Sequence, residues 1–132
     1  MGLRVALENL PSRHTPRPGS AMVDILQLID GLGGHVGVCL DAGHSNANGY
    51  SAAEDARLAG DRLWALHIQD NDGGGDDQHL VPGEGTTDWT AFLEALEDIG
   101  FRGPRTFEVA AADDVPSTLA TLSAIARQWN EG

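Results

Sequence analysis

The feature that most constrains the fold is an alternation of short apolar runs with longer stretches of helical spacing. The apolar runs cover residues 3–7, 36–40, 63–66 and 106–109, and each has the length of a buried strand. Apolar residues recur at intervals of three and four over residues 22–29, 89–96 and 115–129, and a weaker Ala-rich helix covers about 51–59. Strand and helix alternate four times, which predicts a parallel α/β sheet, either open and doubly wound or part of a barrel.

Length and charge limit the class of protein. The chain has 132 residues, enough for one compact domain over 1–132 and too few for two. Its net charge of -12 comes from 20 acidic residues against 8 basic ones, so we expect neither nucleic acid nor an anionic membrane as a partner. The single Cys39 excludes an internal disulfide, and no long apolar stretch or export signal is present, which favours a cytoplasmic location.

Each of the four apolar runs ends in or close to an ionisable residue. These residues are Glu8, Asp41, His67 and Glu108. Because the carboxyl ends of parallel strands lie along one edge of the sheet, we expect the four side chains to share one rim, where α/β proteins build their sites.

Side-chain parity adds a geometric expectation, since residues two apart along a strand share a face. The face below the rim residues is small or polar, and the opposite face is bulky and apolar. This difference favours a barrel, whose interior is confined, over an open sheet covered by helices on both faces. The inner face is predicted to hold Arg4, Ala6, Gly37, Cys39, Leu63, Ala65 and Thr106, and the outer face Val5, Leu7, Val38, Leu40, Trp64, Leu66 and Phe107.

Three carboxylates and one imidazole at one rim need a counter-charge, because neighbouring carboxylates resist joint ionisation. One divalent cation supplies it, and the oxygen-rich ligand set suits Mn²⁺ or Mg²⁺, or Co²⁺ or Zn²⁺ because of the imidazole. Three residues in the loops beyond the rim, His44, Asp77 and His79, are further candidates for binding substrate or a second metal.

Five segments together resemble the xylose-isomerase-like TIM-barrel superfamily, which includes sugar-phosphate isomerases, ketose 3-epimerases, inositol-catabolism enzymes and endonuclease IV. They are Ala6-Leu7-Glu8-Asn9, Leu40-Asp41-x-x-His44, His67-Ile68-x-Asp70-Asn71-Asp72, Asp77-x-His79-Leu80-x-Pro82-Gly83-x-Gly85 and Phe107-Glu108. The order and spacing match four βα units, corresponding to the second half of a (β/α)8 barrel.

The resemblance implies an activity and roles for the rim residues. Residues matching Glu8, Asp41, His67 and Glu108 hold the catalytic metal in that family, and the two glutamates move protons. The implied reaction is isomerisation or epimerisation, or dehydration, of a small sugar, ketose or inosose, by proton transfer through a metal-stabilised enediolate. The residue matching His44 contacts substrate.

Two alternatives stay open beside this reading. The Asp77-x-His79 pair is also a metal-ligand feature of the endonuclease IV branch, so a zinc phosphodiesterase is the second hypothesis. The third is an inactive or truncated half-barrel, since four strands leave two unpaired edges. We expect an isolated monomer to be aggregation-prone, and two copies to be able to complete the barrel by self-association.

The loop after the first strand carries three basic or titratable residues, Arg13, His14 and Arg17. They have the composition of a phosphate clamp, but a solvated surface loop is the preferred interpretation.

Overall fold

A four-stranded parallel sheet organises the chain. The computed structural model describes residues 2–15, 17–110 and 114–131. The strands are β1 (Val5–Glu8), β2 (Val36–Asp41), β3 (Leu63–Ile68) and β4 (Arg105–Phe107), hydrogen-bonded in the order β1-β2-β3-β4. Every neighbouring pair is parallel, so each strand lies beside the next one along the chain, as in half of a (β/α)8 barrel. The predicted fold class is confirmed.

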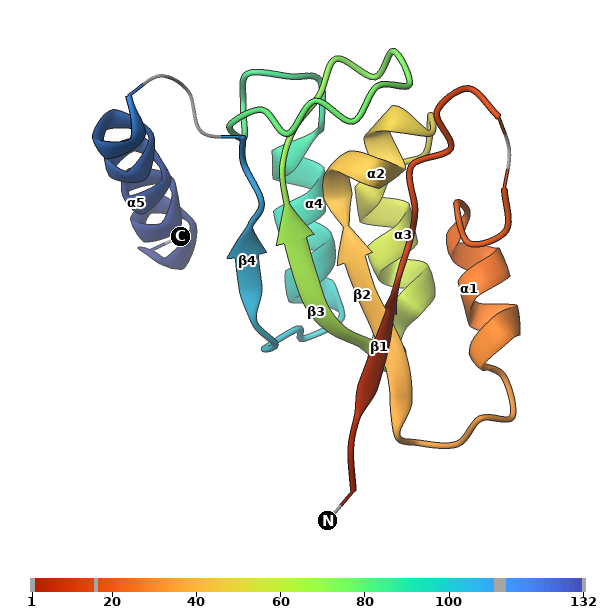
Figure 1. The fold of residues 1–132 in the computed structure, drawn as a ribbon. Coiled ribbons are helices and arrows are strands. Elements are labelled where there is room, and N and C mark those ends of the chain that lie inside the picture. Colours follow the sequence, from red (N-terminus) through yellow and green to blue (C-terminus); the bar gives the residue numbers. More distant parts are fainter. Residues whose placement is uncertain (1, 16, 111–113, 132) are drawn as a thin grey trace.

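One face of this sheet is covered by helices (Figure 1). They are α1 (Met22–Ile29), α3 (Ala52–Ala59) and α4 (Trp89–Asp98), and their apolar sides form one core with the outward residues of the strands. A 3-10 turn, η1 (Gly60–Arg62), leads into β3. The last helix, α5 (Val115–Glu131), lies beyond β4 and has no buried residue. Among the described residues, no helix has the length and apolar character needed to span a membrane.

The outer-face prediction holds at the centre of the sheet. Val38, Leu40 and Leu66 are fully buried against the helix layer, where they meet Phe92 and Ile25. Complete burial of such side chains contributes about 1.5 to 3 kcal/mol each relative to exposure. The interior of the domain is therefore on the helix side, and the opposite face of the sheet is left to form the barrel lumen.

The structure corrects the bounds of two predicted strands and adds one helix. The first strand begins at Val5, because Leu3 stands 79% exposed beyond the pairing with β2. The fourth is three residues long, and Glu108 follows it while still donating its N–H to the Ile68 carbonyl at 3.0 Å. A short helix, α2 (Ala42–Ala47), was not predicted, since its six residues carry no apolar periodicity.

Parity was wrong at the start of β3, where Leu63 and Trp64 exchange faces. The register with β2 shifts there, so that Val38 pairs with Leu63 and the next residue of β2, Cys39, pairs with Ala65. This bulge turns Leu63 into the core and places the Trp64 ring on the inner face, where any Cβ at Gly37 would overlap it. A bulge restores the register beyond the extra residue, so Ala65 and His67 keep the predicted face.

Candidate metal site at the carboxyl edge of the sheet

The four predicted rim residues meet at the carboxyl edge. Glu8 and Asp41 are the last residues of β1 and β2, His67 is the penultimate residue of β3, and Glu108 directly follows β4. Each offers a ligand atom, and these atoms all lie within 4.8 Å of one another. Parallel pairing is the cause, because Asp41 is paired directly with His67 in the register of β2 and β3.

His67 lies between the two glutamates. Its Nδ1 is 3.0 Å from Glu8 Oε1 and 2.9 Å from Glu108 Oε2. The glutamate side chains are 30% and 47% exposed, respectively, so both carboxylates are open to a molecule arriving at the rim. The two strands at the ends of the sheet thus direct one carboxylate each toward the same imidazole nitrogen.

Asp41 is the buried member of the group, with no exposed surface. Its Oδ1 accepts a hydrogen bond from the His44 backbone N–H at 2.8 Å, which caps α2. Its Oδ2 is buried and has no hydrogen-bond partner among the described residues. Burial raises the pKa of Asp41 to about 6, although the neighbouring His44 acts to lower it. A buried carboxylate oxygen without a donor is a group that a cation would satisfy, so this residue set fits a divalent metal.

Asn9 ties the end of β1 to the end of β2. Its side chain is 1% exposed, accepts from Asp41 N at 2.7 Å and donates to Asp41 O at 3.0 Å and Ser45 Oγ at 3.2 Å. Its own backbone carbonyl is 2.7 Å from His44 Nδ1. Because a carbonyl oxygen only accepts, His44 carries its proton on Nδ1 and leaves Nε2 for other partners.

A second group of potential ligands lies beside the first and consists of His44, Asp77 and His79. His79 donates Nδ1–H to the Glu108 carbonyl at 2.6 Å, which leaves its Nε2 at 3.2 Å from Asp77 Oδ1. His44 Nε2 is 3.3 Å from Asp77 Oδ2. Both imidazoles are therefore fixed through Nδ1 by a backbone carbonyl and present Nε2 to one carboxylate, the arrangement in which histidine binds metals.

Charge and hydrogen bonding act together on this second group. Partial burial would lower the pKa of His79, but the Glu108 carbonyl and the Asp77 carboxylate raise it above its ordinary value. Asp77 is itself positioned by Gln69, which is fully buried and donates to Asp77 Oδ1 at 2.7 Å. The structure thus brings all seven predicted site residues into two adjoining groups, with His44 Nδ1 only 3.6 Å from Glu8 Oε1.

Asp70 anchors the loop that carries the second group, a role that the sequence interpretation missed. Its fully buried carboxylate accepts five hydrogen bonds at 2.8 to 3.2 Å, and its backbone forms an isolated antiparallel bridge with Leu80. The donors are Asn71 N, Gly83 N, Gly85 N, Thr87 N and Trp89 Nε1. Burial alone would raise the pKa of Asp70, but these bonds, first that of Trp89, hold it below its ordinary value.

Three polar residues of the site region were therefore assigned no role from the sequence: Asn9, Gln69 and Asp70. The available signal is that each follows a strand by one or two positions, where a polar residue either faces solvent or organises the rim. Their burial separates these two cases, and burial is a property of the folded chain.

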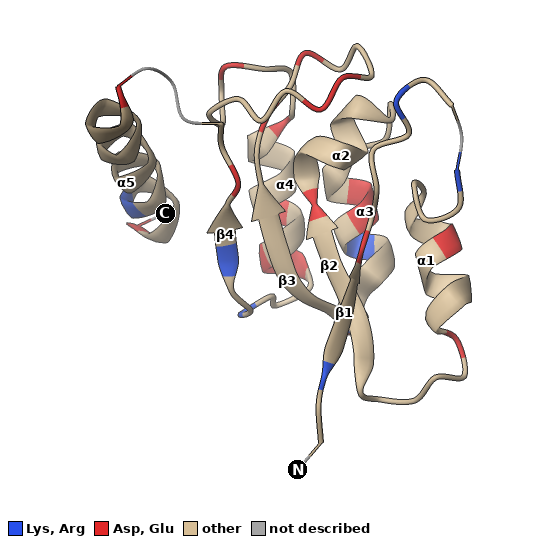
Figure 2. Cartoon of the chain, viewed as in Figure 1, with Lys and Arg blue, Asp and Glu red and all other residues tan. Residues whose placement is uncertain are grey.

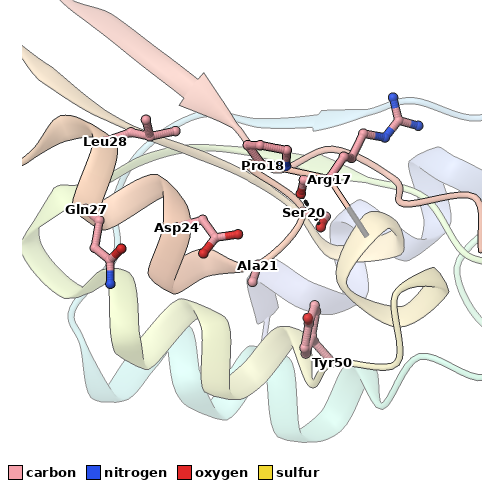
Figure 3. Close-up of a pocket in the computed structure, with 8 residues that line it drawn as sticks. All are labelled: Arg17, Pro18, Ser20, Ala21, Asp24, Gln27, Leu28 and Tyr50. Carbon is pink, nitrogen blue, oxygen red and sulfur yellow. Dashed lines mark hydrogen bonds between the residues drawn. The ribbon is translucent and has the colours of Figure 1, made fainter. Parts of the chain in front are cut away.

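Arg17 of the loop after β1 lines a cavity separate from the rim. This cavity has a volume of about 560 Å³ and lies over α1 beside Tyr50, with the Arg17 guanidinium pointing away from Asp24 and Tyr50 (Figure 3). His14 is 65% exposed and lies 3.8 Å from Asp76. None of the residues lining the cavity belongs to the two ligand groups, which agrees with a surface loop at Arg17 and His14.

Comparison with known proteins gives the same fold and points to sugar epimerases. A D-psicose 3-epimerase of Enterocloster bolteae is 35% identical over 86 residues, which is 64% of this chain and 27% of the epimerase. A D-tagatose 3-epimerase-like protein superposes with a TM-score of 0.79 at 26% identity, covering 97% of this chain and 48% of that one. The IOLI protein, solved with a bound zinc atom, shares the fold with a TM-score of 0.76 at 23% identity, covering 96% and 48%.

The chain thus spans about half the length of these solved structures and about a quarter of the curated epimerase. A family model described as xylose isomerase-like TIM barrel matches residues 1–129. On this match, over nearly all of its length, the chain belongs to the xylose isomerase-like TIM-barrel family.

Proposed function

We propose that this chain is a divalent-metal-dependent isomerase or epimerase of a small sugar, ketose or inosose, acting as one partial-barrel domain over residues 1–132 in the cytoplasm. The observation that carries the proposal is the meeting of Glu8, Asp41, His67 and Glu108 within 4.8 Å at the carboxyl edge. Family membership and the epimerase activity named for the curated relative support this class of reaction.

The metal would be held by these four residues. Three carboxylates and one imidazole suit Mn²⁺ or Mg²⁺, and the imidazole admits Co²⁺ or Zn²⁺. Asp41 Oδ2, which has no hydrogen-bond partner in the described part of the chain, is the atom that most requires such a cation. When bound, a divalent cation would offset the negative charge of the enediolate that forms as a proton leaves carbon.

Glu8 and Glu108 are the proposed proton-transfer residues. Glu8 ends β1 and Glu108 follows β4, at opposite sides of the sheet, and both approach the same His67 nitrogen, so a substrate above His67 would have one carboxylate on each side. One would remove the proton and the other would return it. Delivery to the opposite face gives epimerisation, delivery to the neighbouring carbon gives isomerisation, and loss of hydroxide gives dehydration.

The test is solvent exchange in D₂O. With Mn²⁺ present, a ketose substrate such as D-psicose should take up deuterium at the carbon next to the carbonyl, measured by NMR. Glu108→Gln should abolish this exchange, whereas Glu97→Gln, an exposed glutamate on α4, should leave it unchanged. Full exchange in Glu108→Gln would remove Glu108 from the chemistry.

The second group, His44, Asp77 and His79, is proposed to bind substrate or a second metal. The two options differ in stoichiometry, which zinc titration of the metal-free chain measures directly. A second equivalent that is lost in His79→Ala, with the first retained, indicates a metal site; a single equivalent in both proteins indicates a substrate contact.

A zinc phosphodiesterase resembling endonuclease IV is the second candidate, because the His44-Asp77-His79 group lies directly beside the first. Charge opposes it. Acidic residues lie at the strand ends and in the loop above β3 (Figure 2), and the sequence contains no lysine to displace counterions from DNA. Zinc-dependent cleavage of DNA at an abasic site would favour this alternative over the epimerase.

A further inference from the structure

Asp55 is a buried carboxylate that belongs to neither ligand group. It lies on α3, which packs beside α2 (Figure 1), and is 8% exposed. Its Oδ2 accepts a hydrogen bond at 2.7 Å from the hydroxyl of Ser45, a fully buried residue of α2. Burial raises the pKa of Asp55 above its ordinary value, although the bond from Ser45 acts to lower it. Because a buried charge costs stability unless it is well paired, core packing alone does not explain a carboxylate at this position.

Ser45 joins this carboxylate to Asn9. An ionised carboxylate only accepts hydrogen bonds, and a hydroxyl has one proton to donate, so the Ser45 proton lies on the bond to Asp55. The lone pairs of Ser45 Oγ are then free to accept from Asn9 Nδ2, at 3.2 Å. The Asp41 carbonyl lies 3.5 Å from Ser45 Oγ and is a longer alternative for the same proton. Asp55 thus determines which way the Ser45 hydroxyl points.

The direction of that hydroxyl determines how firmly Asn9 is held. Asn9 Nδ2 has two protons to donate, one to Ser45 Oγ and the other to the Asp41 carbonyl at 3.0 Å. Without Asp55, the Ser45 proton would turn to the Asp41 carbonyl and compete with Asn9 for that oxygen. Asn9 directly follows β1, and its side chain helps to fix the place of its own backbone carbonyl. Asp55 therefore acts on the backbone of Asn9 through Ser45.

The Asn9 carbonyl selects between two tautomers of His44. In one, Nδ1–H donates to this carbonyl, whose oxygen lies 2.7 Å from Nδ1. In the other, Nε2–H would donate to Asp77 Oδ2, at 3.3 Å. Glu8 Oε1 and Asp41 Oδ2 also face Nδ1, at 3.6 and 3.7 Å, beyond hydrogen-bond distance. Only the first tautomer leaves a lone pair on Nε2, so the short bond to Asn9 keeps that atom available.

We propose that Asp55 is a positioning residue of the second ligand group. Through Ser45 and Asn9 it holds His44 in the Nδ1–H tautomer, which keeps Nε2 free for a cation or a substrate hydroxyl. The line of hydrogen bonds runs from the helix layer to the carboxyl edge, and all four of its members are buried, where a low local dielectric strengthens each bond. The inference rests on the proposed function for the use of His44 Nε2, whereas the tautomer is a property of the metal-free chain.

¹⁵N NMR of the histidine rings in the EDTA-treated chain tests the proposal. At about pH 8.5 an ordinary imidazole is neutral, so the ring nitrogen chemical shifts report the ratio of the Nδ1–H to the Nε2–H tautomer. The signals that disappear in His44→Gln identify His44. Asp55→Ala and Ser45→Ala each break the link to Asn9 and should lower this ratio at least about fivefold, the change expected for loss of one ordinary hydrogen bond. Glu54→Ala, at an exposed position on α3, should leave the ratio unchanged.

The two truncations also form a double-mutant cycle. Because both act through the same bond, combining Asp55→Ala with Ser45→Ala should change the ratio no more than either does alone. Ser45→Ala removes a single oxygen atom, so it tests the same link if Asp55→Ala does not fold. A wild-type chain with His44 in the Nε2–H tautomer, an unchanged ratio in the single variants, or additive losses in the double variant would each overturn the proposal. A lower urea midpoint in Asp55→Ala with an unchanged ratio would make Asp55 a structural residue only.

The outcome is separable from that of the proposed function. A wild-type chain that holds His44 in the Nδ1–H tautomer but binds neither Mn²⁺ nor Zn²⁺ in calorimetry would refute only the metal-dependent chemistry. Metal binding together with an unchanged ratio in Asp55→Ala would refute only the role of Asp55. Where Zn²⁺ binds at the second group, its affinity there should fall about 10- to 100-fold in Asp55→Ala, as it does for other residues that orient ligating histidines.

Discussion

The strongest stability prediction concerns Asp70, which connects the end of β3 to the loop over residues 80–87. Asp70→Asn keeps the size of the side chain and removes its charge. In the wild type, Oδ2 accepts from Gly83 N, Gly85 N and Trp89 Nε1, and Oδ1 accepts from Asn71 N and Thr87 N. The best orientation of the new amide turns its oxygen toward the group of three, so its NH₂ faces the remaining two donors.

Those two backbone N–H groups, of buried Asn71 and half-buried Thr87, then have no acceptor on this side chain. A buried donor without a partner costs about 1 to 3 kcal/mol and a half-buried one less, so the variant should lose about 1 to 5 kcal/mol of the free energy of unfolding. This is a large part of the roughly 5 to 15 kcal/mol typical of a domain. The loop that positions His79 and Asp77 should open first, and hydrogen exchange should be fastest over residues 80–87.

Urea unfolding followed by circular dichroism at one fixed protein concentration measures the difference. Asp72→Asn is the matched control, because the Asp72 side chain is exposed and, among the described residues, accepts hydrogen bonds only from Gly74 N and Gln78 Nε2. Its effect should stay within about 0.5 kcal/mol. A loss below about 1 kcal/mol in Asp70→Asn would show that the five hydrogen bonds do not hold the loop as argued.

Three further predictions concern pH and close packing. Because a metal binds the ionised carboxylate and burial raises the pKa of Asp41 to about 6, calorimetry should show metal affinity falling about tenfold per pH unit below pH 6; affinity independent of pH from 7 to 5 would contradict this. In the metal-free chain, folded Asp41 keeps its proton between pH 3.8 and about 6, where the unfolded chain has lost it. The contribution of Asp41 to the free energy of unfolding should therefore fall as pH rises from 3.8 to about 6, as denaturation at several pH values would show. Gly43→Ala should cost about 1 to 3 kcal/mol, since its Cβ would overlap the Gln69 amide that holds Asp77. The substitution should weaken binding at the second group more than at the first, and an equal loss of affinity at both groups in metal titrations would argue against this linkage.

The sequence was sufficient to predict the rim because the rim follows from topology. Four apolar runs in parallel must end at one edge, and Glu8, Asp41, His67 and Glu108 occupy those ends whatever the details of packing. The helices with clear periodicity, α1 and α4, were also predicted close to their bounds. The helices depend on local pattern alone, and the rim requires in addition only that the four strands run parallel.

What the sequence could not predict depends on tertiary packing. The bulge at Trp64 arises from the register between two strands that lie far apart along the chain, and it reversed the faces of Leu63 and Trp64. The role of Asp70 depends on donors up to 19 residues away, which a loop brings back without any periodic signal. Helix α2 is six residues long and has the Asp41 side chain as its N-terminal cap. It carries no apolar stripe that the sequence pattern could reveal.

The two ligand groups are prepared for a cation in different ways. In the second, Nδ1 of His44 and of His79 each donates to a backbone carbonyl, so the Nε2 atoms that face Asp77 are free of protons in the neutral imidazoles. In the first, His67 Nδ1 lies within 3.0 Å of both Glu8 and Glu108, and two carboxylates around one nitrogen require a proton there. Under the proposed function, a cation at the first group would take the place of that shared proton. Glu8 and Glu108 would then help to hold the cation and would no longer be paired with the imidazole proton, which is the state in which the proposal has them act as acid and base.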